Sequence, residues 1–205
     1  MANHLHEGDI PDGVFAGVAS VAVDSETMGL VLGRDPLCVV QLSAGDGDAH
    51  VVRLHRPGYD APNLKRLLAD PDVLKIFHFG RFDIAMFLLH LKVLTAPVYC
   101  TKIASKLART YTDRHGLKDL VKEVLGVDIS KTQQSSDWGA LRLTPEQVAY
   151  AASDVTSLHA LKIKLDEMLV REGRADLAKA SFGFLPHRAA LDVAGWADVD
   201  IFAHS

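Results

Sequence analysis

Residues 15–24 read FAGVASVAVD, an apolar and β-branched run that ends at Asp24, two positions before Glu26. Two similar runs follow, LCVVQLS at 37–43 and AHVVRL at 49–54, each after a turn-forming stretch, GRDP or AGDGD. Short runs of this kind, bounded by Gly, Pro and Asp, are typical of strands. We therefore expect the first third of the chain to be β-rich, with both acidic side chains on one face at a strand end.

The rest of the chain is predicted to be mostly helical. Helical spacing occurs at 62–70, 81–94, 101–110 and 116–126, and short strands are predicted at 73–79 and 97–100. A long helix is predicted over 144–173, with Thr144 as N-cap, Pro145 in the first turn and Gln147 in the capping-box position. Strands first and helices around them indicate an α/β fold with a mixed sheet.

Composition limits the class of protein. A chain of 205 residues, 48% hydrophobic and 23% charged, suits a single globular domain with a sizeable core. The polar N-terminus does not resemble a signal peptide, and no apolar run approaches the ~20 residues of a membrane helix. Cys38 and Cys100 fit a reducing compartment better than a disulfide framework. We expect a cytoplasmic protein with no membrane partner.

The net charge of −4 bears on nucleic-acid partners. Proteins that bind long nucleic acids usually carry a basic surface, because contacts with phosphates provide most of their affinity. This acidic chain is therefore not expected to act on a long duplex. A short oligonucleotide, which has few phosphates, remains compatible.

Acidic residues occur in three separated stretches that together suggest a metal site. Asp24 and Glu26 end the first run, Asp83 lies in the first turn of a predicted helix, and Tyr150 and Asp154 are four residues apart on another. Each residue alone is more often a turn former, a helix cap or a core tyrosine. Four carboxylates together need cations, and a pair of divalent ions with oxygen ligands can hydrolyse a phosphodiester.

These motifs resemble the ribonuclease D branch of the DEDD 3′–5′ exonucleases, in the subgroup whose third motif carries a tyrosine. Asp24-x-Glu26 matches the first motif, Asp83 the second and Tyr150-x3-Asp154 the third, and GLKDLVKEVLGVDISKTQQSSDWGALRLTPEQVAYAASDV resembles the segment leading into the third. The resemblance covers residues 21–165 and implies a ribonuclease H-like mixed sheet flanked by helices. We expect one exonuclease domain over 1–205, with a motif core at 21–165 and a helical tail at 166–205.

Within this branch the chain is similar to the diribonucleases. The similarity includes IFHFGRFDIA, CTKIASKLARTYTDRHGLK and the terminal DIFAHS, which extend outside the catalytic motifs. Phe79 follows His78 where ribonuclease D usually has Asn. We also expect that the helical RNA-binding domains usually found after the nuclease domain are missing, because the sequence stops at Ser205. The resemblance implies hydrolysis of RNA dinucleotides, including 5′-phosphorylated ones such as pGpG, to mononucleotides by a ring of eight subunits.

The resemblance also implies residue roles. Asp24 would bridge two divalent ions, Glu26 and Asp154 would complete the shell of one, and Asp83 would support the other. Tyr150 would orient the attacking water. Mg²⁺ suits these oxygen ligands, and Mn²⁺ should substitute. Zinc is not expected, because no His pair at ligand spacing lies beside a Cys, and His4, His6 and His204 lie near termini expected to fray.

Substrate contacts are predicted with alternatives. The candidates are Thr27, Leu30, His78, Arg81, Lys102 and Arg109. Leu30 is either a wedge between two bases or a core leucine. Lys102 and Arg109, in a run of cations from residue 102 to 118, either bind phosphate, line a subunit interface or form a solvated helix face. His78 and Arg81 flank Asp83 and are placed to contact phosphate or to steady the metal carboxylates.

Three functions remain open at this stage. The first is a dinucleotide-specific exoribonuclease, and the second is a general exonuclease that trims longer or structured RNA 3′ ends. The third, a silent RNA-binding module, is disfavoured because all four acids and the tyrosine are present.

Trp138 is expected to be a buried anchor with its indole N–H bonded, rather than a surface for base stacking.

Overall fold

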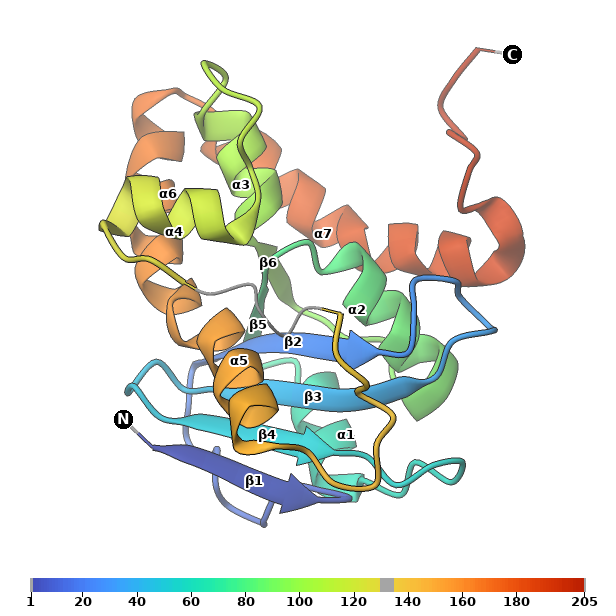
Figure 1. Cartoon of the computed structure of the whole chain (residues 1–205). Coiled ribbons are helices and arrows are strands. Elements are labelled where there is room, and N and C mark those ends of the chain that lie inside the picture. Colours follow the sequence, from blue (N-terminus) through green and yellow to red (C-terminus); the bar gives the residue numbers. More distant parts are fainter. Residues whose placement is uncertain (1, 130–134, 205) are drawn as a thin grey trace.

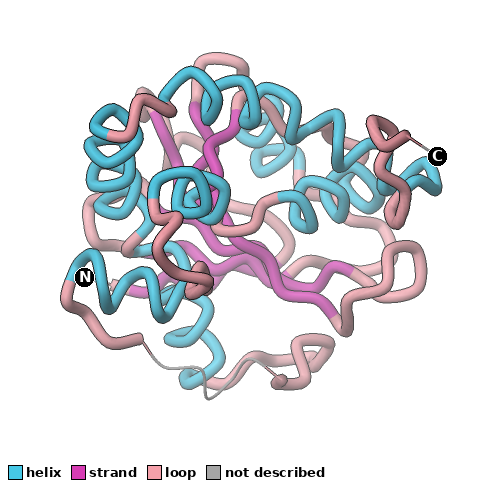
Figure 2. Tube along the Cα trace, turned by 90° about the horizontal axis from the view of Figure 1, so that it is seen from above, coloured by secondary structure: helices cyan, strands magenta, loops and turns pink. Residues whose placement is uncertain are grey.

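The computed structural model describes residues 2–129 and 135–204, which form a mixed sheet with helices on both faces (Figure 1, Figure 2). The strands are β1 (Asn3–Glu7), β2 (Ser20–Thr27), β3 (Leu37–Ser43), β4 (Ala49–Arg53), β5 (Leu74–Phe77) and β6 (Val98–Cys100). The helices are α1 (Pro62–Ala69), α2 (Arg81–Met86), α3 (Thr101–Ala108), α4 (Leu117–Leu125), α5 (Pro145–Thr156), α6 (Leu158–Arg171) and α7 (Ala175–Leu191). Two π-helical turns, η1 (Phe87–Leu91) and η2 (Asp192–Trp196), continue α2 and α7.

The strand order is β1-β4-β3-β2-β5-β6. β3 runs antiparallel to its neighbours β2 and β4, and the other pairs are parallel. This is the mixed sheet predicted from the sequence. None of the helices in the described ranges is both long and apolar enough to cross a membrane.

Alternation along β2 divides the core into two layers. Val21 and Val23 pack with apolar residues of α1, α2 and α7 on one side of the sheet. Ala22 packs with apolar residues of α3, α4, α5 and α6 on the other side. Successive side chains of a strand point to opposite faces, so even-numbered positions of β2 face the α5 layer and odd-numbered positions face the α2 layer.

The N-terminus of α5 is fixed by the predicted capping box. Gln147 N donates to Thr144 Oγ1 at 3.2 Å, and Thr144 N donates to Gln147 Oε1 at 2.8 Å. Two backbone N–H groups that the helix leaves unpaired are thereby satisfied. Because α5 carries Tyr150 and Asp154, this cap helps to set where both side chains lie along the sheet.

The predicted first strand is shorter than its apolar run. β2 begins at Ser20, and the residues before it form turns. Gly13 and Gly17 have φ angles of 78° and 74°, in the left-handed region that favours glycine. These turns fold Phe15 against the core without extending the strand.

Two further predictions about the elements are wrong. His4 and His6 do not lie in a frayed terminus, because β1 pairs in parallel with β4 from Asn3 to Glu7. The predicted helix over 144–173 is two helices, which meet at Ser157. Near this junction Thr156 Oγ1 donates to the Ser153 carbonyl at 3.5 Å, one of the side-chain to backbone bonds that compete with helical pairing.

The C-terminal part docks on the α2 layer, as its apolar residues suggested. Leu185 and Ala189 of α7 are buried in the same core cluster as Ile84 of α2. Arg81 also donates to Asp192 in η2, at 2.5 and 2.8 Å. The segment after η2 stays against α7, where Arg188 donates to the Val199 carbonyl at 3.2 Å and the Phe202 ring lies 5.7 Å from that of Phe184, and the chain ends above this helix (Figure 1).

Candidate active site

Three carboxyl groups converge where β2 lies beside α5. Asp24 and Glu26 occupy even positions of β2 and so face the α5 layer, where Asp154 lies one helical turn after Tyr150. One oxygen from each of Asp24, Glu26 and Asp154 lies within 4.8 Å of the other two. The fold thus brings three of the acids expected in one metal site together, although positions 24 and 154 are far apart in the sequence.

The fourth acid reaches this cluster from the opposite layer. Asp83 lies in the first turn of α2 and is 5% exposed. Ser25, between the two β2 acids, faces the α2 layer, and its Oγ donates to Asp83 Oδ1 at 2.5 Å. The end of β2 thus presents Asp24 and Glu26 to one layer and holds Asp83 in the other.

Gln41 is a member of the site that the sequence analysis missed. It lies on β3 directly opposite Asp24 and is fully buried, and its Nε2 donates to Asp24 Oδ2 at 2.7 Å. A neutral donor orients this carboxylate without neutralising it, so Asp24 stays available to a cation. The signal in the sequence was a single amide inside the apolar run LCVVQLS.

The electrostatics of the cluster favour bound cations. Burial, followed by the charges of Asp83, Asp154 and Glu26, raises the pKa of Asp24 well above its ordinary value. Burial, with Asp154 and Asp83, raises the pKa of Glu26 to about 9, and burial raises that of Asp83 to about 7. Within residues 2–129 and 135–204, no salt bridge pairs Asp24, Glu26 or Asp83 with Lys or Arg. Carboxylate oxygens of this kind are the ligands that Mg²⁺ and Mn²⁺ prefer.

Tyr150 is placed to donate a hydrogen bond next to these acids. Burial and the charges of Asp154, Glu26 and Asp24 all raise the pKa of its hydroxyl. The phenol therefore stays protonated at neutral pH. Its ring packs at a tilt against Trp138, with 6.0 Å between ring centroids.

Trp138 is a buried anchor, as predicted, with 2% of its surface exposed. The expected bond of its indole N–H is not found, because Nε1 has no partner within the described ranges. The preceding residues are tied to α5 instead, where Gln147 Nε2 donates to Ser136 Oγ at 2.8 Å and to the Asp137 carbonyl at 3.1 Å. Gln134, the first residue of the QSSDW motif, lies outside the described residues.

Two candidate substrate residues lie at the edge of the site, Thr27 at the end of β2 and Leu30 in the turn that follows it. Leu30 is 80% exposed, so the alternative of a core leucine is wrong. Thr27 is half-buried, and its Oγ1 donates to the Gly29 carbonyl at 2.6 Å, which tightens the turn that carries Leu30. A large apolar side chain held in water beside an acidic cluster is available to a ligand.

The residues that flank Asp83 are engaged by the protein. His78 Nδ1 lies 2.9 Å from Thr101 Oγ1, and burial lowers the pKa of His78 to about 3, so its ring is neutral. Arg81 forms a two-point ion pair with Asp192 and donates to the Ala197 carbonyl at 2.8 Å. These contacts connect the second motif to α3 and to the C-terminal segment.

The cation run from residue 102 onward is not a uniform solvated face. Lys102 Nζ lies 4.3 Å from the centre of the Phe79 ring, close to the second motif. Arg109, by contrast, is fully buried, and its guanidinium contacts Ser105, the Arg114 carbonyl and Glu123. The prediction that Arg109 contacts substrate is wrong for this conformation, because its donors are used to fold the segment between α3 and α4.

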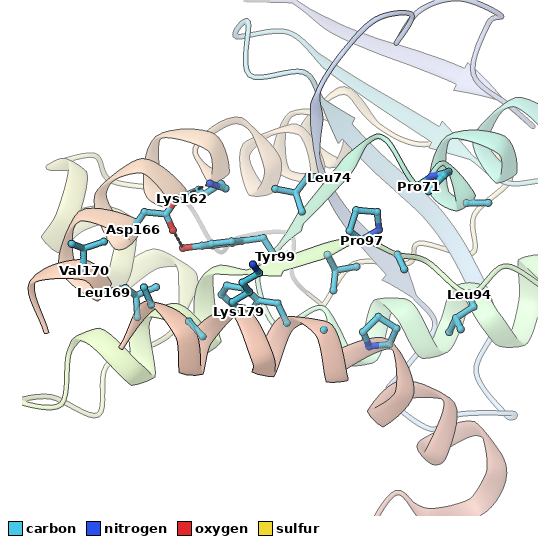
Figure 3. Close-up of a pocket in the computed structure, with 18 residues that line it drawn as sticks. Pro71, Leu74, Leu94, Pro97, Tyr99, Lys162, Asp166, Leu169, Val170 and Lys179 are labelled. Atoms are coloured by element: carbon cyan, nitrogen blue, oxygen red, sulfur yellow. Dashed lines mark hydrogen bonds and ion pairs between the residues drawn. The ribbon is translucent and has the colours of Figure 1, made fainter. Parts of the chain in front are cut away.

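A cavity formed by β6, α6 and α7 lies away from the acidic cluster. It has a volume of about 870 Å³ and is formed by β6, α6, α7 and the segments around Pro71 and Leu94. Figure 3 shows Tyr99 on its wall, bonded to Asp166 at 2.9 Å, with Lys162 beside them. None of the acidic motif residues lines it, so this cavity is separate from the acidic cluster.

Comparison with known proteins agrees with the geometry. Residues 14–170 match the 3′–5′ exonuclease family model. Ribonuclease D of Gluconacetobacter diazotrophicus is 38% identical over 171 residues, which is 83% of this chain and 43% of that protein. The chain therefore spans less than half the length of that curated relative.

Solved structures resemble the whole chain. Brucella melitensis NrnC with bound Mg²⁺ is 52% identical, with a TM-score of 0.96 and full coverage of both chains. NrnC of the same organism bound to pGG is 53% identical, with a TM-score of 0.95 and 98% of each chain covered. The chain belongs to the DEDD 3′–5′ exonucleases, in the NrnC-like group that is related to ribonuclease D.

Proposed function

We propose that the chain is a 3′–5′ exoribonuclease that hydrolyses short RNA, above all dinucleotides such as pGpG, to nucleoside monophosphates in the last step of RNA decay. The observation that carries this proposal is the meeting of Asp24, Glu26 and Asp154, with Asp83 beside them. The NrnC structure with bound pGG supports the dinucleotide as substrate. We also propose that residues 1–205 act as one exonuclease domain.

Two divalent ions complete the site in this proposal, Mg²⁺ by preference and Mn²⁺ as a substitute. Asp24, Glu26 and Asp154 would hold one ion, and Asp83, with Asp24, would hold the other. When bound, the ions lower the pKa of the attacking water and neutralise charge on the leaving 3′-oxygen. The NrnC structure with Mg²⁺ supports this choice of metal.

The chain itself supplies orientation. Gln41 holds the Asp24 carboxylate from β3, and Ser25 holds Asp83 from β2, so these acids are fixed before substrate binds. Tyr150 keeps its proton and donates it in a hydrogen bond that orients the attacking water.

The substrate lies between the acidic cluster and the turn after β2. Leu30 separates the two bases as an apolar wedge, and Thr27 fixes the turn that presents it. Lys102, beside Phe79, contacts the phosphate at the far end of the dinucleotide. His78 and Arg81 position the second motif, because their polar atoms already bind Thr101 and Asp192.

We further propose that the protein is a homo-oligomer, with a ring of eight subunits as the assembly. Exposed apolar side chains support subunit contacts, because isolated soluble domains seldom leave many together in water. Those of the C-terminal segment are Trp196, Val199, Ile201 and Phe202. Light scattering should give a mass several times 22.3 kDa, and a monomer of 22.3 kDa would contradict the ring.

The test compares substrate lengths. 5′-Phosphorylated RNAs of different lengths, from the dinucleotide to chains of about twenty residues, are supplied with Mg²⁺, and kcat/KM is compared. A strong preference for the dinucleotide supports the proposal. Equal or better cleavage of long RNAs would support the alternative of a general trimming exonuclease.

A second measurement tests the site independently of substrate length. Asp154→Asn keeps the size of the side chain and removes the charge, so it should abolish hydrolysis of every RNA while the protein stays folded. Circular dichroism checks the fold. Retained hydrolysis would mean that the acidic cluster is not the active site.

A further inference from the structure

Another cavity lies between α3, α7 and the segment that leads into α2, and we call it the α3–α7 cavity. Its volume is about 400 Å³, which is within the ~300–1,000 Å³ range of small-molecule sites. The charged and aromatic side chains that line it are Phe79, Arg81, Lys102, Lys106, Phe184 and Arg188. None of the four acids of the active site is among its lining residues, so it is separate from the metal site.

Positive charge gathers around this cavity, in a chain whose net charge is −4. Among the described residues that line it, four are cationic and none is an acid. Arg81 and Arg188 are already engaged, because both pair with Asp192, at 2.5 and 3.0 Å. Lys102 and Lys106, by contrast, form no salt bridge within residues 2–129 and 135–204. The charge that no carboxylate neutralises is therefore on the α3 side of the cavity.

The start of α3 adds to this charge. Lys102 and Lys106 are four residues apart and so lie on one face of the helix. Cys100 and Lys102, on either side of the first helical residue, both line the cavity, and no side chain caps this end of α3. The first N–H groups of a helix have no partner inside the helix, and together with its dipole they favour an anion such as a phosphate.

Aromatic rings form the other part of the wall. Phe79 has a φ angle of 67° and is 48% exposed, and a bulky residue persists in this strained region only where its neighbours fix it. His78 lies 2.9 Å from Thr101, and a Cβ at Gly80 would lie 2.6 Å from the end of β5, so the turn is held on both sides. Phe184 of α7 supplies a second, partly exposed ring. Exposed aromatic rings stack on nucleic-acid bases.

We propose that the α3–α7 cavity binds a nucleotide, with its base against Phe79 and Phe184 and its phosphate at Lys102 and Lys106. Basic side chains beside aromatic rings recognise a phosphate and a base together. The nucleotide has two sources, a free mononucleotide or the next residue of an RNA longer than a dinucleotide. The second source rests on the proposed function, in which Lys102 contacts the far phosphate of the dinucleotide.

The first test is isothermal titration calorimetry of the full chain with GMP in chelator, where no divalent ion holds a phosphate at the acidic cluster. Wild type should bind one GMP, and inorganic phosphate or guanosine should each bind at least about tenfold more weakly, because each makes only part of the contacts. Lys106→Ala and Phe184→Ala should each weaken GMP binding about tenfold. Lys179→Ala, an exposed lysine of α7 that lines the other cavity, is the control and should bind GMP as wild type does.

The second test identifies the source of the nucleotide through kcat/KM on a dinucleotide and a trinucleotide with Mg²⁺. If RNA enters the cavity, Lys106→Ala and Phe184→Ala should lower kcat/KM on the trinucleotide about tenfold and leave that on the dinucleotide unchanged. If only a free mononucleotide enters, both variants should cleave both RNAs as wild type does. Thermal unfolding checks the fold of the variants, and both positions are exposed.

Three results would overturn the inference. They are a wild type that binds no GMP in chelator, inorganic phosphate that binds as tightly as GMP, and folded Lys106→Ala and Phe184→Ala that both bind GMP as tightly as wild type. Each of them leaves hydrolysis of the dinucleotide intact. Failure of the proposed function is a different result, because a wild type that does not cleave the dinucleotide in Mg²⁺ would still bind GMP in chelator.

Discussion

Replacement of Glu26 by Gln should raise the free energy of unfolding of the metal-free protein at neutral pH. Burial and the charges of Asp154 and Asp83 raise the pKa of Glu26 from 4.5 to about 9. An acid whose pKa rises on folding contributes stability that is complete below the unfolded pKa and is lost as pH rises towards the folded pKa. For Glu26 this window runs from 4.5 to about 9.

The size of the effect follows from the same values. A pH of about 7 is about 2.5 units above the ordinary pKa of Glu26. At about 1.4 kcal/mol per unit, burial of this acid lowers the free energy of unfolding by about 3 kcal/mol at that pH. Gln has a similar size and no charge, so the variant avoids this cost. Urea unfolding in chelator at about pH 5 and about pH 7 measures it. Glu167→Gln, at an exposed position of α6, is the control.

The order of stability should reverse with metal. Millimolar Mg²⁺ should stabilise wild type more than Glu26→Gln, because the variant has lost a ligand oxygen. Its nuclease activity should be lost for the same reason. Two results would contradict the reasoning. Either Glu26→Gln is less stable than wild type in chelator near neutral pH, or the free energies of unfolding of the two proteins depend on pH in the same way. In both cases, burial and mutual repulsion of the acids would not oppose folding.

Three other substitutions separate site residues from core residues. Leu30→Ala should lower kcat/KM on a dinucleotide about tenfold, while the free energy of unfolding changes by less than about 0.5 kcal/mol. An unchanged kcat/KM would contradict the proposed role of Leu30 as a wedge between the bases. Trp138→Ala should lower the free energy of unfolding, measured in urea, by about 3–5 kcal/mol, whereas Leu141→Ala, at an exposed position, should leave it unchanged. Similar free energies of unfolding for the two variants would contradict the role of Trp138 as a buried anchor. Arg109→Ala should cost about 2 kcal/mol because Glu123 and the Arg114 carbonyl lose their donor, whereas the folded variant should keep the wild-type KM. A raised KM with unchanged stability would restore Arg109 as a substrate contact.

The acidic motifs could be located from the sequence because they depend on local geometry. The side-chain period of two puts Asp24 and Glu26 on one face of β2, and the four-residue spacing puts Tyr150 and Asp154 on one face of α5. That the two pairs share a site was implied by the resemblance to the DEDD exonucleases. The capping box at Thr144 is equally local and is confirmed. What the spacing could not supply is Gln41, because its contact with Asp24 depends on the register between β2 and β3.

The predictions for β1 and for Arg109 were wrong because both depend on contacts between distant parts of the chain. β1 is polar and has exposed side chains, so its pairing with β4 leaves little hydrophobic signal. Arg109 lies at helical spacing from Lys102 on the sequence, yet the chain after α3 folds back and buries it. Burial of a charged side chain depends on which distant acceptors surround it, and no local pattern encodes that.

The hydrogen bond from Ser25 to Asp83 has a consequence for how the protein tolerates change. The acids come from both helical layers, and one strand is the common reference for their positions. Any substitution that shifts α2 or α5 against β2, however remote, alters the distances between the carboxylates. Catalytic arrangements lose efficiency when displaced by about 0.5 Å. The two apolar cores therefore act as an alignment mechanism, and their packing is under the same functional constraint as the acids themselves.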